Sequence, residues 1–193
     1  MTVKHVFPIP IIQTTVPPHL IKDALEKTLK YIADTNFCDP PAPGELLTTY
    51  YKDDNKNFLG NIGCIDLLRW INEEVRKYFI LLGYRDDVYI EITSWLQLNQ
   101  PGSDFVRHDH YGAITSGCVY LQVPADGGAI LFHNPLEARR CTQAFFKHLG
   151  QVENDYNFNH VKVDISAGEM LMFEPWIQHT VPVSYTHLRA HET

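Results

Sequence analysis

Two histidines separated by one residue form the part of the sequence best suited to chemistry. They lie in the stretch FVRHDHYGA, residues 105–113, as His108 and His110, with Asp109 between them. Successive side chains of a β-strand point to opposite faces, so on a strand the two histidines share a face and Asp109 points away. The pair can offer two imidazole nitrogens to one metal ion, and a third ligand must come from elsewhere in the chain.

The best candidate for the third ligand is His179, in the stretch FEPWIQHTVPV. It follows an apolar run and a turn and precedes a second β-like run, and residues far apart in sequence meet at the mouth of a β-barrel. His133, in FHNP, is an alternative, although that stretch is typical of a strand end. The chain holds 10 histidines, so spacing alone leaves open that these are ordinary surface or core residues.

Helices are predicted before the histidine pair. Apolar residues recur at helical spacing in residues 17–35 and 65–83, and Gly83 is placed to end the second helix. Prolines in residues 6–16 predict an extended segment suited to a sheet edge. The apolar stripes of the two helices are Ile21, Leu25, Leu29 and Ile32 in the first, and Leu68, Ile71, Val75 and Phe79 in the second.

From residue 88 onward the sequence has the pattern of short antiparallel strands. Residues 88–99 alternate between two sets of side chains, which predicts one long strand. Helices followed by short strands predict an α+β protein, mainly β, with a helix-supported barrel or jelly roll. Residues 136–160 interrupt the strands and are expected to form a lid or a substrate-facing insertion. Further strands are predicted in ITSGCVYLQVP, GGAILFHNP, VKVDI and GEMLMFEPW.

Composition and charge narrow the class of protein. The 193 residues suffice for one domain with a sizeable core. The net charge of −7, with no long basic run, argues against a nucleic-acid partner. No segment has the pattern of a membrane span or a signal peptide. The widely spaced cysteines, which lack a C-x-x-C motif, favour a reducing cytoplasm; they are Cys38, Cys64, Cys118 and Cys141.

Several motifs, in their order, resemble the iron(II)/2-oxoglutarate-dependent oxygenase superfamily. These motifs are H-x-H in SWLQLNQPGSDFVRHDH, S-G-x-x-Y-L and G-G-x-x-x-F in TSGCVYLQVPADGGAILFHNP, and P-W-x-x-H-x-V in GEMLMFEPWIQHTVPV. With VFPIPI near the start, the resemblance extends over residues 5–184. More narrowly, the chain is similar to an oxygenase family common in phages and marine bacteria.

The resemblance implies a double-stranded β-helix (jelly roll) that holds iron(II) at one end. His108 then matches the first histidine of the superfamily site and His179 the distal one, while His110 takes the position of the usual carboxylate. Either three imidazoles hold the iron, or an irregular backbone lets Asp109 supply an oxygen; strand alternation favours the first. Three histidines are also a known zinc arrangement, so the ligand set does not identify the metal.

The resemblance also implies a site for the cosubstrate 2-oxoglutarate. The superfamily commonly places an arginine for its far carboxylate about ten residues after the distal histidine, where Arg189 stands. The chain ends SYTHLRAHET, residues 184–193, which resembles translated adapter sequence; we expect this tail to be non-native and the match of Arg189 coincidental. Asn99 and Tyr120 are candidate cosubstrate partners or barrel-lining residues, and Trp176 is expected either beside the iron in the substrate pocket or in the core.

These inferences predict one oxygenase domain over residues 1–183, with helical support in 1–87 and the β-core in 88–183. The expected protein is a dioxygenase of a bacterial or phage-infected cytoplasm. It uses O2 and 2-oxoglutarate to hydroxylate an unknown small molecule or peptide, releasing succinate and CO2. The alternatives are a three-histidine metal dioxygenase or hydrolase without 2-oxoglutarate, and a non-catalytic metal- or ligand-binding β-barrel. No nucleic acid or membrane partner is expected.

Overall fold

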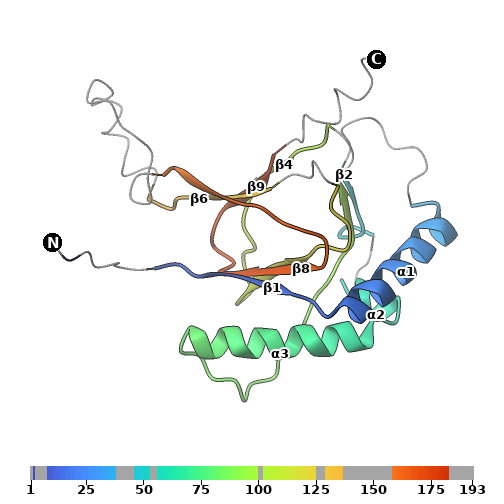
Figure 1. Ribbon diagram of the computed structural model, residues 1–193, viewed down its shortest axis with the longest axis horizontal. Coiled ribbons are helices and arrows are strands. Elements are labelled where there is room, and N and C mark those ends of the chain that lie inside the picture. The colour runs from blue at the N-terminus through green and yellow to red at the C-terminus, as the bar shows by residue number, and fades with distance from the viewer. Residues whose placement is uncertain are drawn as a thin grey trace.

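Helices cover one face of a β-sheet, and a second sheet covers the other face (Figure 1). The computed structural model describes residues 2, 8–37, 46–52, 56–99, 102–124, 129–136 and 158–182. The described part of the chain is mainly β in its second half, with antiparallel strands throughout both sheets. None of its helices combines the length and the apolarity that crossing a membrane requires.

The first sheet is the middle layer. It has the order β1-β8-β5, with the strands β1 (Ile11–Thr15), β8 (Glu169–Phe173) and β5 (Ser116–Val119). Alternate residues of β8 face opposite layers. Met170 and Met172 belong to the core shared with the helices, whereas Leu171 and Phe173 belong to the core shared with the second sheet.

The second sheet has the order β4-β9-β6-β7 and packs against the first as a β-sandwich. The inner face of β6 contributes Ile130 and Phe132, which pack with Leu171 and Phe173 of the first sheet. A separate two-stranded sheet pairs β2 (Leu46–Thr48) with β3 (Gln97–Asn99). The strands of the second sheet are β4 (Phe105–His108), β9 (His179–Val181), β6 (Ile130–His133) and β7 (His160–Val163).

The first predicted helix is confirmed as α1 (Pro18–Thr35), but its buried face differs from the prediction. The buried residues are Leu20, Ala24 and Thr28, whereas Leu29 is 48% exposed. The apolar stripe is broad, and the face that packs is rotated by about one residue from the predicted one.

The second predicted helix is confirmed as α3 (Ile65–Leu81), preceded by the short helix α2 (Phe58–Asn61). Val75 and Phe79 are buried as predicted, and Leu67 and Tyr78 join them. Gly83 follows the helix with a φ of +79°, a conformation that glycine adopts without steric cost.

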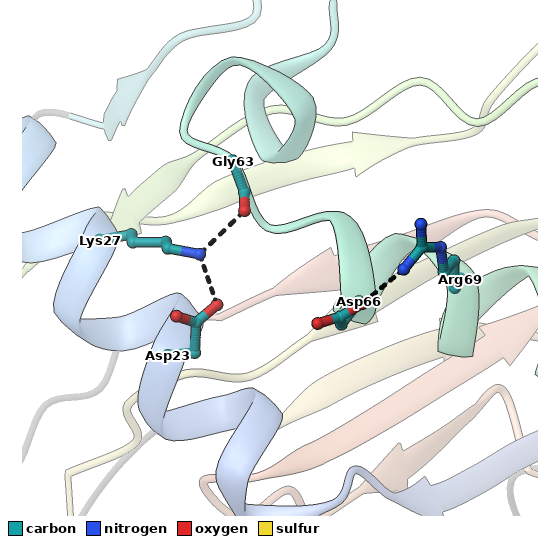
Figure 2. Close-up of polar contacts among 5 residues, drawn as sticks. All are labelled: Asp23, Lys27, Gly63, Asp66 and Arg69. Carbon is teal, nitrogen blue, oxygen red and sulfur yellow. Dashed lines mark hydrogen bonds and ion pairs between the residues drawn. The ribbon is translucent and has the colours of Figure 1, made fainter.

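Lys27 joins α1 to the turn that precedes α3. Its Nζ donates to Asp23 Oδ2 at 2.7 Å and to the carbonyl oxygen of Gly63 at 2.8 Å (Figure 2). Further along, Arg69 forms an exposed ion pair with Asp66 at 2.7 Å on α3 itself. Lys27 thus links α1 to the start of α3.

One prediction about the strands was wrong. The long strand predicted over 88–99 is limited to β3, because the residues before it run beside α3 instead of pairing in a sheet: Arg76 donates to the carbonyl oxygens of Asp86 and Val88. The extended segment predicted over 6–16 is confirmed in part. It contains β1, which pairs with β8 at one edge of the middle sheet.

Candidate metal centre

The three histidines singled out in the sequence lie together. One ring nitrogen from each of His108, His110 and His179 falls within 4.8 Å of the other two. Among the described residues, this is the only group of three or more His, Cys, Asp or Glu side chains arranged to hold a metal ion. The alternative ligand His133 is not a member; its Nε2 lies 3.2 Å from Thr180 Oγ1.

Two neighbouring strands and one loop position the three rings. His108 ends β4 and is the cross-strand partner of His179, the first residue of β9. Their ring centroids are 4.2 Å apart, and the His110 centroid is 5.1 Å from each of them. The antiparallel pairing of β4 with β9 therefore brings together residues that are far apart in the sequence.

His110 reaches the cluster for a different reason than the sequence predicted. The strand ends at His108, so strand alternation does not extend to His110. Its backbone N–H instead donates to the carbonyl oxygen of Pro175 at 2.9 Å, which ties the loop after β4 to the turn between β8 and β9. Asp109 is exposed and outside the cluster.

Backbone carbonyls set the tautomers of two of the rings. His108 Nδ1 lies 2.9 Å from the carbonyl oxygen of Val106, and His179 Nδ1 lies 3.0 Å from that of Ile177. A carbonyl oxygen can only accept, so each Nδ1 carries a hydrogen, and Nε2 is the nitrogen that the neutral ring can offer to a metal. Histidines that bind metals are commonly oriented in this way.

The site is apolar on its inner side. His179 is only 3% exposed, and its ring lies 4.8 Å from that of Phe173 and 5.9 Å from that of Phe132. Burial lowers the pKa of His179 to about 4, helped by the neighbouring His108 and His110. Burial likewise lowers the pKa of His110. Since these imidazoles are neutral at neutral pH, the nitrogen donors fit a divalent ion such as Fe(II) or Zn(II).

Tyr120 belongs to the apolar core between the two sheets. It directly follows β5 and packs against the core cluster that includes Phe132 and Phe173, and its backbone N–H donates to the carbonyl oxygen of Glu169 at the start of β8. Burial raises the pKa of the Tyr120 hydroxyl, and the neighbouring Cys118 thiol contributes to the rise. The phenol therefore stays protonated and is a possible hydrogen-bond donor at neutral pH.

Asn99 and Arg189 are the other predicted cosubstrate residues. Asn99 is an exposed residue at the end of β3, where its Oδ1 accepts from Gln97 Nε2 at 3.1 Å. Arg189, the tail 184–193 and residues 137–157 of the insertion lie outside the residues that the structure describes.

Trp176 is half exposed on the turn between β8 and β9. It lines a surface hollow of about 200 Å³ together with Arg107, His133, Pro135 and Gln178. Arg107 and Gln178 each directly precede a histidine of the cluster, and their side chains are exposed. The prediction that Trp176 belongs to a substrate pocket stays a prediction.

The ring of Trp95, which was not singled out from the sequence, contacts the cluster. The Trp95 centroid is 6.0 Å from that of His110 and 5.2 Å from that of Tyr50. Arg107 and Gln178 were also missed as neighbours of the site. Their positions next to His108 and His179 were the only signal in the sequence that could have pointed to them.

The cluster lies within a recognised family domain. Residues 93–189 match the protein family described as "Putative 2OG-Fe(II) oxygenase", and the match covers just over half of the 193 residues. It includes the three histidines and Tyr120, and it reaches Arg189. No curated protein shows significant sequence similarity to the chain.

Proposed function

Because the chain belongs to the 2OG-Fe(II) oxygenase family, we propose that it is an iron(II)- and 2-oxoglutarate-dependent dioxygenase. It hydroxylates a small molecule or peptide and releases succinate and CO2. The observation that carries this proposal is the cluster of three imidazoles, two of which have Nε2 left for a metal by a bond at Nδ1. The proposed location is the cytoplasm of a bacterium or of a phage-infected host.

The proposed fold is a double-stranded β-helix. Two facing antiparallel sheets support it, as does the origin of His108 and His179 on the adjacent strands β4 and β9. In such a fold the ligands lie at one end of the sandwich, between its sheets, where a substrate can approach from outside.

Each residue of the site has a proposed role. His108, His110 and His179 would hold the metal, and iron(II) with 2-oxoglutarate would supply the oxidising chemistry. The carbonyl groups of Val106 and Ile177 orient two of the imidazoles. The packing of Phe132 and Phe173 excludes water from the inner side of His179. Tyr120 would donate its hydroxyl hydrogen to 2-oxoglutarate.

An anaerobic titration tests this function. Iron(II) followed by 2-oxoglutarate should produce a weak visible charge-transfer band in the wild-type protein, and His179→Ala should abolish it. On admission of O2, the complex should form succinate. Arg189→Met should weaken 2-oxoglutarate binding without changing the iron affinity if that arginine binds the far carboxylate. Iron binding with no band and no 2-oxoglutarate binding would contradict the proposal.

One observation favours a second candidate. No carboxylate joins the three imidazoles in the cluster as the structure describes it, and three histidines with an open position also form catalytic zinc sites. A metal dioxygenase or hydrolase without 2-oxoglutarate would bind zinc or iron tightly and give no cosubstrate-dependent band. The same titration therefore separates the two candidates, and failure to form any product would favour a metal-binding module.

A further inference from the structure

The two strands that carry His108 and His179 are joined irregularly. In the β4–β9 pair, Phe105 is the partner of Val181 and His108 the partner of His179, with a register shift between them. Among the described strands, β4 is at the edge of its sheet, so β9 is its only neighbour there. An edge strand with an interrupted ladder has few backbone hydrogen bonds to fix its position.

A hydrogen bond between side chains crosses this irregular pair. Arg107 Nε donates to Gln178 Oε1 at 2.7 Å. Each residue directly precedes a candidate ligand, and both side chains are exposed, on the face of the sheet away from the buried His179. The bond therefore links the backbone before His108 to the backbone before His179.

The Gln178 end of this link is itself anchored. Its backbone carbonyl accepts a hydrogen bond from the His133 N–H of β6 at 2.8 Å. Gln178 is thereby fixed to the inner part of the sheet, whereas Arg107 belongs to the edge strand. Both side chains line the surface hollow, so changing them leaves the apolar core intact.

We propose that Arg107 and Gln178 are positioning residues for the metal centre. Their hydrogen bond holds the edge strand, which leads into His108 and His110, at the distance from His179 that one metal ion requires. A metal site tolerates only small errors in ligand position, and loss of an outer contact commonly weakens metal binding by about 10–100-fold. The inference rests on the proposed metal site but not on the use of 2-oxoglutarate.

Cobalt(II) is a suitable probe, because its visible absorption depends on coordination geometry and requires no turnover. Arg107→Met and Gln178→Leu should each weaken cobalt(II) binding about tenfold or more and change the visible spectrum. The double variant should bind cobalt(II) with an affinity no lower than that of the poorer-binding single variant, because both changes break the same hydrogen bond. Gln178→Glu keeps an acceptor for Arg107 and should restore wild-type affinity and spectrum.

Arg69→Met is the matched control. It removes an exposed arginine from its pair with Asp66 on α3, and it should leave the cobalt(II) affinity and spectrum unchanged. Thermal unfolding of each metal-free variant shows whether it is folded at the temperature of the titration. If one variant at Arg107 fails to fold, the comparison of Gln178→Leu with Gln178→Glu still decides the question.

The outcomes separate this inference from the proposed function. Wild-type affinity and spectrum in both single variants, or additive losses in the double variant, would overturn the positioning role. If the wild-type protein binds cobalt(II) with the expected variant effects but 2-oxoglutarate leaves the spectrum unchanged, the positioning role stands and the proposed function fails. If the wild-type protein binds no cobalt(II), both fail.

Discussion

His108 and His179 are direct cross-strand partners, and their ring centroids lie 4.2 Å apart. Side chains of partner residues on one face of an antiparallel pair are close enough to bind the same metal ion. With each Nδ1 bonded to a backbone carbonyl, both rings present Nε2. This relationship is the basis of the candidate site, to which the loop after β4 adds His110.

The choice between His110 and Asp109 can be tested directly. Loss of a residue that only supports a ligand typically weakens metal binding by about 10–100-fold. His110→Ala should weaken cobalt(II) binding by a larger factor, because it removes one of the three ligands. Asp109→Ala should leave the affinity close to that of the wild-type protein, because this side chain is exposed and outside the cluster. Isothermal titration measures both affinities. A loss in Asp109→Ala as large as that in His110→Ala would assign the third ligand to the carboxylate.

The metal-free protein should lose stability as the pH falls from about 6.5 to about 4. The pKa of His179 is about 4 in the folded protein, against an ordinary value of 6.5. In this window the unfolded chain binds a proton that the folded protein does not, so stability is complete above the unfolded pKa and decreases below it. The free energy of unfolding should fall by up to roughly 3 kcal/mol from this group alone.

Urea unfolding at several pH values, in the presence of a chelator, measures this loss. His179→Leu removes the titrating group and should flatten the profile over the same window. A wild-type profile no steeper than that of the variant would show that His179 titrates normally in the folded protein.

Metal binding should quench the fluorescence of Trp95. Its ring centroid is 6.0 Å from that of His110, so a paramagnetic ion bound to His110 lies close to the indole. Titration with cobalt(II) should therefore lower the emission of the wild-type protein, and Trp95→Phe should remove most of the metal-dependent change. Trp70→Phe is the control, because Trp70 packs in the core between the helices and the middle sheet. Equal quenching with and without Trp95 would contradict the placement.

Gly117→Ala should destabilise the middle sheet. A Cβ at this position would lie 2.4 Å from the carbonyl oxygen of Leu171 in the neighbouring strand β8, and a backbone atom in a ladder cannot move away cheaply. We expect a loss of about 2–3 kcal/mol in the free energy of unfolding. Chemical unfolding measures it, with Ser116→Ala on the same strand as the control. A neutral effect would mean that β5 and β8 can separate without cost.

Local patterns in the sequence predicted most of the elements. The helical spacing of apolar residues predicted α1 and α3, and short apolar runs predicted β5 to β8, because each depends on which side of one element is buried. The prediction of a strand over 88–99 failed for most of its length. Alternating side chains indicate an extended segment, but they do not show whether a neighbouring strand is present to pair with it. Pairing of β1 with β8 joins residues from the two ends of the described chain, and no local pattern contains that information.

The same division applies to the candidate site. By itself the sequence determined that His108, His110 and His179 were the candidate ligands, since residue type and motif order are properties of the chain. Only the tertiary structure decided how they meet. Cross-strand register brought His179 beside His108, and the bond from His110 to Pro175 placed a loop residue where strand alternation no longer applied. The tautomers of His108 and His179 and the Arg107–Gln178 bond likewise depend on distances in space, which a chain acquires only when its strands are paired.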